Sequence, residues 1–364
     1  MNILYTNFHP HYGGGHTTYL RYLLRNATNK NFLACPKTSQ LYQILEKKGE
    51  GEGEVTLFDV SFPSKFKDIF SIVKSIFKIA RIIKKNDIDL VHTNENADNR
   101  IIFYASLLTR KKFKVVLTKH NAKGIKKRIT SRLRFNKFNS AVIYVSKSVV
   151  NTIGVSDIKV PVHIIENGVD TDYWQLKPGP PSPILTLVSI AGTAPCKGLK
   201  HLIQAIKKLP ADKKKQLRVK IVGKLLSTNY IDSEFEGDYC PEVVSFVGYR
   251  EEAKNELIGA DLGFVLSDSE ETISFACREM MSCGLPVLVS DIGCLPDNVD
   301  HGVSGWVTKR ADVNAIFEAL LDILNKTPSE LSSMKKAARQ KALASFGVDL
   351  MIEKTQKVYA SLKT

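Results

Sequence analysis

Two carboxylates stand at a spacing that suits the recognition of a sugar. Glu271 and Glu279 lie eight positions apart, the first just ahead of a predicted helix and the second inside it, and Ser274 is suited to cap that helix. A carboxylate accepts paired hydrogen bonds from vicinal hydroxyls, so Glu279 could hold a ribose and Glu271 a sugar ring. The free N–H groups at the start of the helix suit a diphosphate. This segment therefore favours recognition of hydroxyl and phosphate groups.

A lysine beside a glycine forms a second candidate phosphate site. Lys197 and Gly198 lie in a tight loop between a predicted strand, 184–189, and an amphipathic helix, 199–208. The lysine could reach a phosphate while Gly198 lets the backbone turn closely. Taken alone, these residues leave a second interpretation open, that of a surface lysine at the start of a helix.

A run of glycines follows the first predicted strand. Gly13, Gly14 and Gly15 lead into a predicted helix. A dinucleotide fingerprint, G-x-G-x-x-G, would need its last glycine where Thr18 stands, so that pattern is absent. The loop could approach a phosphate or simply form a turn.

Short strand-like runs alternate with longer helical patterns, which predicts an α/β fold with parallel sheets covered on both faces. The alternation is interrupted at 177–183, where seven residues include four prolines and one glycine that no helix or central strand absorbs. We therefore predict an N-terminal domain (1–176), a linker (177–183) and a C-terminal domain (184–348). Two such halves form a cleft, the usual place for a ligand in open sheets. The expected strands are 3–6, 32–34, 90–93, 114–118, 141–145, 184–189, 218–222, 243–246, 262–266, 286–290 and 305–307.

The composition is that of a folded globular protein, with 43% hydrophobic and 24% charged residues in a chain of 364. The six cysteines include no CxxC pair, so we expect reduced thiols in the core and neither a disulfide nor a zinc site. The first residues show no basic region followed by an apolar stretch, so we expect no secretory signal, and no window approaches the roughly 20 apolar residues that cross a bilayer. We expect a cytoplasmic protein.

The net charge of +15 is uneven along the chain. Arg110–Lys137 contains twelve Lys or Arg and no acid, and Lys65–Lys85 contains seven against the single acid Asp68. Such segments could attract nucleic acid, anionic lipid or an anionic substrate, or could be solvated helix faces. Within Lys65–Lys85 we favour packing of an apolar stripe on the sheet, while the lysine face could contact a membrane. The stripe consists of Ile69, Val73, Ile76, Ala80 and Ile83.

Together these residues resemble the retaining nucleotide-sugar glycosyltransferases of family 4, which have the GT-B fold of two facing Rossmann-like domains. Glu271 and Glu279 look like the E-x7-E pair of that family, and Lys197-Gly198 resembles its phosphate-binding Lys-Gly. Gly13–Gly15 stand where the family has its N-terminal glycine loop. The resemblance is scattered over nearly the whole chain.

Further segments extend the resemblance. Residues 118–121 look like the Thr-x-His-Asp segment, whose histidine, here His120, lies beside the donor sugar. Residues 165–170 resemble the Asn-Gly-Val-Asp stretch before the interdomain linker, and 290–305 resemble the loop and turn after the glutamate helix. The last helix of the family often crosses back onto the N-terminal domain, as 349–361 could do here.

The resemblance implies retaining, metal-independent transfer of a sugar from a nucleoside-diphosphate donor, with no further cofactor. Phosphate-binding groups would stabilise the leaving diphosphate, and the acceptor hydroxyl would attack from the side that it leaves, without a protein nucleophile. The catalytic residues would be His120, Glu271 and Lys197. The donor-binding residues would be Gly14, Gly15, Lys197, Gly198, Lys224, Val247, Gly248, Glu271, Thr272, Ile273, Ser274 and Glu279, with the base near Val247 and Gly248.

The acceptor is expected on the N-terminal domain, as is usual in this fold. Its basic segments suit an anionic, membrane-anchored glycan or glycolipid, such as a lipopolysaccharide core or a lipid-linked polysaccharide. The protein would then be peripheral on the inner face of the cytoplasmic membrane, with no nucleic acid as a partner.

Three positions depart from the family pattern. Gly192 stands five residues before Lys197, where the family usually has an arginine, and Lys224 is a candidate for supplying the missing charge. Ser274 replaces a glycine, and Asn121 replaces an aspartate.

Two other interpretations compete with glycosyl transfer. A basic nucleic-acid-binding protein would use Arg110–Lys137 and show strongly salt-dependent binding, but it leaves the glutamate pair without a purpose and no recognised motif accompanies the charge. A GT-B relative could instead act on a nucleotide sugar without transfer, as an epimerase does. The triplets 87–89 and 170–172 fit the Asp-x-Asp metal pattern of a different fold, but they read better as the start of a strand and a turn.

Overall fold

A computed structural model describes residues 1–11, 14–25, 29–48, 55–63, 68–121, 131–132, 134–148, 150, 158–176, 182–225, 227, 235, 239–269 and 271–363. The chain divides into two compact units, unit 1 (Met1–Asn167 and Asp349–Thr364) and unit 2 (Gly168–Val348). Gly13, most of the expected linker and the centre of the basic segment Arg110–Lys137 lie outside the described residues.

The units divide after Asn167, ahead of the proline-rich segment at which the sequence placed the boundary. The reason is local pairing. Val169 forms a parallel bridge with Gly347, and its N–H donates to the Phe346 carbonyl at 2.7 Å. Trp174 is buried in the core of unit 2. Residues 168–176, expected in the N-terminal domain, therefore belong to unit 2.

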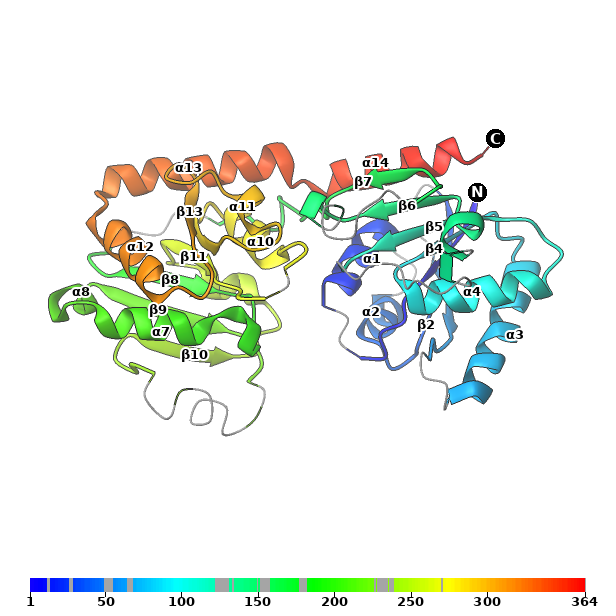
Figure 1. Ribbon diagram of the computed structural model, residues 1–364, viewed down its shortest axis with the longest axis horizontal. Helices are drawn as coiled ribbons and strands as arrows, with labels where there is room; N and C mark the ends of the chain where they lie inside the picture. The colour runs from blue at the N-terminus through cyan, green and yellow to red at the C-terminus, as the bar shows by residue number, and fades with distance from the viewer. Residues whose placement is uncertain are drawn as a thin grey trace. The chain divides into compact units, whose positions relative to one another are not determined.

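Unit 1 contains a seven-stranded parallel sheet in the order β3-β2-β1-β4-β5-β6-β7 (Figure 1). The strand order reverses between β1 and β4, so the loops that follow these two strands border the switch point, where open parallel sheets bind ligands. The strands are β1 (Asn2–Thr6), β2 (Lys30–Cys35), β3 (Val55–Asp59), β4 (Leu90–Thr93), β5 (Lys114–Lys119), β6 (Ala141–Tyr144) and β7 (Val162–Ile164). β3 and β7 were not expected from the sequence.

Helices cover both faces of this sheet, which explains the continuous apolar runs of its strands. On one face, Leu4 of β1 packs in a core with residues of α3 (Ile69–Lys85) and α4 (Asn96–Leu108). The opposite face carries Tyr5 and His92, whose rings are in contact, and the His92 ring also contacts the rings of Tyr19 and Tyr359. The remaining helices are α1 (Gly15–Arg25), α2 (Gln40–Lys48), the short π-helical η2 (Arg134–Phe138) and α14 (Val348–Ser361).

The C-terminal helix α14, red in Figure 1, is anchored to unit 1 by a buried polar network. The Tyr359 hydroxyl meets Nδ1 of His92, and Nε2 of His92 lies 2.6 Å from the Thr118 hydroxyl. Gln356 of the same helix accepts from Asn29 at 3.2 Å. The last helix therefore reaches the strand that ends beside His120.

The apolar stripe predicted on α3 is only partly correct. Ile83 is buried as expected, whereas Ile69 and Val73 are 40% and 42% exposed. The buried residues of α3 are Ser75, Ile79, Ile82 and Ile83, so the buried side is rotated from the predicted stripe and is concentrated in the second half of the helix.

Unit 2 contains a six-stranded sheet in the order β10-β9-β8-β11-β12-β13, with every pair parallel. Its strands are β8 (Leu185–Ser189), β9 (Leu217–Val222), β10 (Val244–Gly248), β11 (Leu262–Val265), β12 (Val287–Ser290) and β13 (Gly305–Thr308). The order reverses between β8 and β11, which places a second switch point there. The six strands predicted for this half of the chain, from 184–189 to 305–307, are confirmed to within a few residues.

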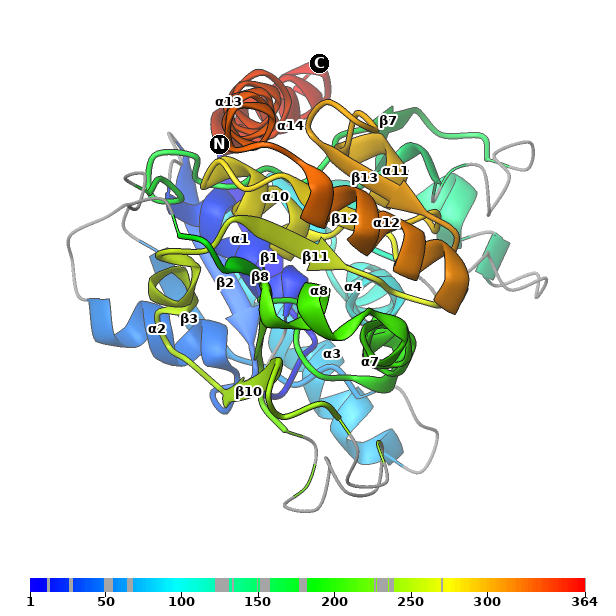
Figure 2. The same cartoon turned by 90° about the vertical axis from the view of Figure 1, so that its left-hand side faces the viewer.

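The two faces of this sheet are buried under different helices (Figure 2). Alternate residues of β11 show this directly: Phe264 packs with α7 (Leu199–Lys208) and α12 (Val313–Asn325), and Val265 packs with α10 (Phe275–Ser282) and α13 (Pro328–Ser345). The other elements are η3 (Pro195–Lys197), α8 (Ala211–Lys215), η4 (Ala253–Leu257) and α11 (Leu295–Asn298).

All six cysteines are free, and all except Cys196 are buried, as expected. Among the helices of the described residues, none combines the length and apolar character needed to cross a bilayer.

Candidate active site

The loops at the switch point of unit 2 carry the two charged groups that the sequence singled out. Lys197 ends η3 in the loop after β8, and Glu271 lies in the loop after β11. Lys197 Nζ is 2.8 Å from Glu271 Oε2, and the Ser267 hydroxyl donates to the same oxygen at 2.7 Å. The structure thus brings Lys197 and Glu271 together at the strand ends, where an open parallel sheet binds its ligand.

The pair is positioned by the strand ends and remains accessible. The side chains of Lys197 and Glu271 are 22% and 10% exposed. Ser267 is itself held because its carbonyl accepts from the Ser290 hydroxyl at 2.5 Å, which ties the ends of β11 and β12 together. A ligand can therefore approach the ammonium without unfolding the loops.

Two glycines allow these loops to approach one another. Gly198 has φ of +66°, and a Cβ there would lie 2.0 Å from the Leu266 carbonyl oxygen. Gly293 has φ of +59°, and a Cβ there would lie 1.7 Å from the carbonyl oxygen of Glu271. Any larger residue would push the loop away from the Lys197–Glu271 pair.

The N-terminus of α10 directly follows Glu271. Ser274 is the N-cap, as predicted, and its hydroxyl accepts from the Cys277 N–H at 3.3 Å. Thr272 and Ile273 form the short connection between Glu271 and this cap. The first turn of α10 thus presents a partial positive charge beside the ion pair, which favours an anion.

Glu279 lies in the second turn of α10 and has a different environment from Glu271. It is partly buried, and desolvation raises the pKa of its carboxyl to about 8. Within the part of the chain that the structure describes, no hydrogen bond or ion pair reaches this carboxyl. Glu279 is therefore protonated at neutral pH and able to donate as well as accept a hydrogen bond.

The ends of β9 and β10 place the remaining predicted donor residues beside the same edge of the sheet. Gly248 ends β10, and its carbonyl accepts from the Gly223 N–H at 3.0 Å. The Lys224 carbonyl accepts from the Thr193 hydroxyl at 2.6 Å, so Lys224 follows β9 next to Gly192. The Lys224 side chain is exposed and has no ion pair among the described residues. It stands close to the position of the missing arginine.

The switch point of unit 1 combines neutral polar groups with a buried ion pair between Lys119 and Glu95. His120 follows β5 and is buried, and its Nε2 donates to the side-chain oxygen Oδ1 of Asn94 at 3.1 Å. Asn94 is oriented because its own amide donates to the Thr6 carbonyl at 2.9 Å. Burial, reinforced by neighbouring rings and Lys119, lowers the pKa of His120 well below its usual value. The imidazole is therefore neutral.

His16, in the first turn of α1, packs on His120 with ring centroids 4.2 Å apart, and His9 packs on His16 at 4.6 Å. Burial lowers the pKa of His16 to about 3. Gly14, with φ of +47°, and Gly15 form the turn that starts α1. Their N–H groups and the three rings share one end of the sheet.

Several of these residues escaped the sequence analysis. Ser267, Asn94, His9 and His16 were not predicted, although Ser267 and Asn94 each follow a buried strand closely, which is the position where parallel sheets carry functional groups. A buried ion pair between Lys119 and Glu95, 2.8 Å apart, was likewise missed. The position of single polar residues just after predicted strands was the sequence signal that could have indicated Ser267 and Asn94.

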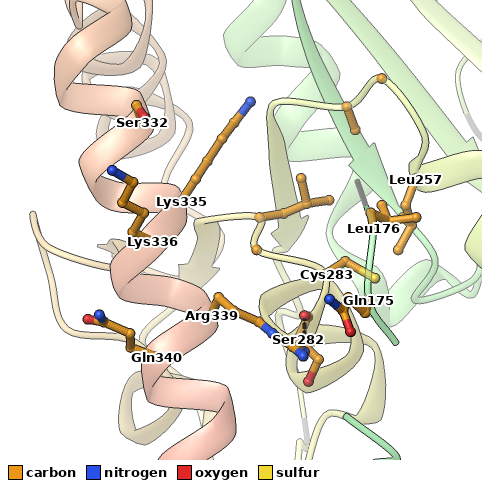
Figure 3. A pocket seen from close by; sticks show the side chains of 14 residues that line it. Gln175, Leu176, Leu257, Ser282, Cys283, Ser332, Lys335, Lys336, Arg339 and Gln340 are labelled. Atoms are coloured by element: carbon orange, nitrogen blue, oxygen red, sulfur yellow. Dashed lines mark hydrogen bonds between the residues drawn. The ribbon is translucent and has the colours of Figure 1, made fainter. Parts of the chain in front are cut away.

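The pocket in Figure 3 belongs to another part of unit 2. Its volume is about 420 Å³, and its walls include the segments before β11 and β12, at the ends of the strands opposite to Lys197. Arg339 in its wall donates to the carbonyls of Thr171, Trp174 and Ser282. This arginine joins three backbone segments, so it holds unit 2 together and is not free for a ligand.

Comparison with known proteins agrees with this arrangement. Residues 13–173 match the family described as Glycosyltransferase Family 4, and residues 174–341 match the family described as Glycosyl transferases group 1. The chain is a family 4 glycosyltransferase. Its two parallel-sheet, Rossmann-like units give it the GT-B fold, as predicted.

Individual relatives of this glycosyltransferase are distant. It is 22% identical over 297 residues to N-acetyl-alpha-D-glucosaminyl L-malate synthase of Bacillus anthracis, covering 78% of this chain and 77% of that protein. It is 28% identical over 183 residues to the putative colanic acid biosynthesis glycosyltransferase WcaL of Escherichia coli, covering 48% and 45%. The structure of Anabaena Alr3699/HepE in complex with UDP-glucose has a TM-score of 0.81 at 18% identity and covers 100% of both chains.

Proposed function

We propose that this glycosyltransferase takes a sugar from a nucleoside-diphosphate donor held at the switch point of unit 2, with retention of configuration and without a metal ion. The observation that carries the proposal is the accessible Lys197–Glu271 pair beside the N-terminus of α10. An ammonium and a helix N-terminus supply the positive charge that a leaving diphosphate requires.

Lys197 would exchange partners when the donor binds. In the free protein its ammonium is paired with Glu271. A diphosphate carries more charge than one carboxylate, so Lys197 would turn to the phosphate and release Glu271 to accept hydrogen bonds from the hydroxyls of the donor sugar. Lys224, exposed next to Gly192, would add the second positive charge that family relatives usually draw from an arginine.

Glu279 would hold the ribose. Because its pKa is raised to about 8 and it has no partner among the described residues, its carboxyl can both accept from and donate to vicinal hydroxyls. Val247 and Gly248 at the end of β10 would lie near the base. The UDP-glucose complex of the Anabaena protein supports a uridine nucleotide as the first donor to test.

The acceptor would be a hydroxyl of a glycan or glycolipid held by unit 1. Neutral His120, fixed by Asn94, suits hydrogen bonding to an uncharged hydroxyl, and it would position the donor sugar. The Escherichia coli relative is named for colanic acid biosynthesis, which supports a role in surface polysaccharide or lipopolysaccharide synthesis at the inner face of the cytoplasmic membrane.

Thermal stabilisation by a panel of UDP-, GDP-, ADP- and CMP-sugars tests the donor. The panel is run on the wild type, Lys197→Ala and Glu279→Ala, with Lys200→Ala as the matched control because Lys200 is an exposed lysine of α7. One sugar nucleotide should stabilise the wild type and the control but neither site variant. A flat response of the wild type to all four classes would contradict the proposal.

The product distinguishes transfer from its alternative. With the identified donor and a membrane extract as the source of acceptor, the anomeric configuration of the new linkage is read by NMR. Retention is expected. Release of an isomerised free sugar nucleotide, with no linkage to an acceptor, would favour the epimerase-like alternative.

A further inference from the structure

The first half of α3 exposes large apolar side chains that unit 1 does not use for packing. Phe70 is 88% exposed, Phe77 is 61% exposed and Val73 is 42% exposed. Their spacing, i, i+3 and i+7, places them along one side of the helix. Single exposed apolar residues are ordinary, but a stripe containing two phenyl rings indicates a binding surface.

All charged residues of this helix are basic. From residue 69 to 85 there is no Asp or Glu, and the cations are Lys74, Lys78, Arg81, Lys84 and Lys85. Lys74 and Arg81 are exposed and, by helical spacing, lie on the same outward side as Phe70 and Phe77. Lys78 contacts the Asp59 carbonyl. The outward side of α3 therefore combines apolar rings with positive charge.

This half of α3 lies beside the carboxyl ends of the strands of the unit 1 sheet. A helix that connects parallel strands runs back along the sheet, so its first residues lie at the carboxyl ends of the strands. The contacts agree: Lys78 reaches the end of β3, and Arg100, in the first half of α4, donates to the Pro63 carbonyl ahead of α3 at 2.9 Å. His120 and Asn94 lie at this same edge of unit 1.

We infer that the outward side of α3, formed by Phe70, Val73, Phe77, Lys74 and Arg81, is a docking surface for an anionic lipid bilayer. Phenyl and valyl side chains enter the boundary between headgroups and acyl chains, while lysine and arginine extend their charged ends to the lipid phosphates. The negative surface potential of the cytoplasmic leaflet attracts such a basic segment.

Charge decides between a bilayer and a second copy of this chain. A symmetric contact through this side of α3 would place Lys74 and Arg81 of both copies against each other, with no acid on either helix to compensate. An anionic bilayer satisfies both the apolar and the basic groups. A glycolipid acceptor embedded in that bilayer would then enter at the strand ends of unit 1, a consequence that rests on the proposed function. The docking itself does not depend on it.

Vesicle flotation of the full chain tests the docking surface. Vesicles of phosphatidylglycerol and phosphatidylcholine are compared with pure phosphatidylcholine at low and high salt. The apolar variant is Phe70→Ser/Phe77→Ser, and the charge variant is Lys74→Ala/Arg81→Ala. The matched control is Ile258→Ser/Val303→Ser, which removes apolar residues of unit 2 that are 62% and 56% exposed.

The wild type and the control should float with phosphatidylglycerol vesicles, less at high salt, and should float weakly with phosphatidylcholine. The apolar variant should lose about tenfold or more in partitioning, and the charge variant about tenfold at low salt only. Because the four substituted residues of α3 are exposed, the variants should keep the wild-type melting temperature, which shows that they fold.

Absence of wild-type binding to phosphatidylglycerol vesicles would overturn the inference, as would equal binding by the apolar variant. A concentration-dependent dimer that the apolar variant abolishes, with vesicle binding unaffected, would assign α3 to self-association instead. Nucleotide-sugar stabilisation of the apolar variant separates the two proposals. If vesicles bind but no sugar nucleotide does, the proposed function fails and the docking surface stands.

Discussion

Units 1 and 2 are built on the same plan, a parallel sheet whose strand order reverses beside β1 in one and beside β8 in the other. The groups at the two switch points are nevertheless different. Unit 2 places a partly exposed ion pair, Lys197 and Glu271, beside a helix N-terminus. Unit 1 places neutral imidazoles there, with the pKa of His16 and His120 lowered by desolvation, and its own ion pair, Lys119 and Glu95, is buried. One topology therefore supports two chemistries, and the side chains at the strand ends decide which.

The difference matches the two tasks of a glycosyltransferase. A leaving diphosphate gains negative charge in the transition state and needs fixed positive charge, which unit 2 supplies. A hydroxyl acceptor and a sugar ring need directional, uncharged hydrogen bonds, which a neutral histidine fixed by an amide supplies. Each of the following experiments changes one side of this comparison.

Removing the ammonium of unit 2 should have the largest effect. Lys197→Ala should lower the rate of sugar transfer about 10²- to 10³-fold, because a charge that meets the leaving group is lost. Release of nucleoside diphosphate in the presence of acceptor-containing membranes measures it. Lys200→Ala should behave as the wild type. Equal rates for Lys197→Ala and Lys200→Ala would show that the charge on unit 2 serves the structure alone.

Removing the imidazole of unit 1 should have a smaller effect of a different kind. His120→Ala should lower kcat about 10- to 100-fold, with His163→Ala on β7 as the control. Because the pKa of His120 lies well below its usual value, the imidazole is neutral at pH 7, and the wild-type pH–rate profile should show no inflection from it near pH 6.5. A histidine-dependent inflection near pH 6.5, absent in His120→Ala, would contradict the neutral site.

The anchor of α14 should contribute to stability more than to catalysis. Tyr359→Phe removes the hydroxyl that meets His92 and leaves a buried imidazole nitrogen without its partner. The free energy of unfolding, from urea denaturation, should fall by about 1 to 2 kcal/mol. Tyr104→Phe alters an exposed tyrosine of α4 and should change it by no more than a few tenths. Equal values for the two variants would rule out the anchoring role.

The effect of Glu279 on stability should appear as a pH dependence. Its pKa rises from 4.5 in the unfolded chain to about 8 in the folded protein. The stability that its proton contributes is therefore fully present below pH 4.5 and is lost as the pH rises through 8. The melting temperature of Glu279→Gln minus that of the wild type should therefore increase from pH 5 to pH 9.

Glu318→Gln on α12 is the control for the Glu279 experiment, because Glu318 is an exposed carboxylate of the same unit. Its melting temperature should follow that of the wild type across the same pH range. A constant difference between Glu279→Gln and the wild type would mean that the Glu279 carboxyl is ionised throughout.

The sequence predicted the charged half of the site better than the neutral half. Lys197, Glu271 and Ser274 stand in a local pattern of strand, loop and helix, and local patterns fix the position of a cap and of the residues beside it. Their direct contact joins two loops 74 residues apart, and the E-x7-E and Lys-Gly motifs pointed to both. His9 and His16 have no motif, so their packing on His120 became visible only in the folded sheet.

Most of the fold was likewise predictable, and the exceptions have physical causes. The central unit 2 strands β11 and β12 are apolar runs buried on both faces, which makes them recognisable. β3 and β7 are edge strands, only partly buried, so their patterns are weak. On α3 the helix itself was predicted, but which side packs depends on tertiary contacts. Phe70 and Phe77 were therefore not expected on the outside.

The donor site at Lys197 is tested most directly by calorimetric titration of UDP, and then of GDP and ADP if UDP does not bind, into the wild type, Lys197→Ala and Lys200→Ala. The account predicts binding to the wild type and to Lys200→Ala, and at least tenfold weaker binding to Lys197→Ala, because the diphosphate loses its ammonium partner. If the wild type binds no nucleoside diphosphate, or if all three proteins bind UDP equally, then the Lys197–Glu271 site of unit 2 does not hold the donor.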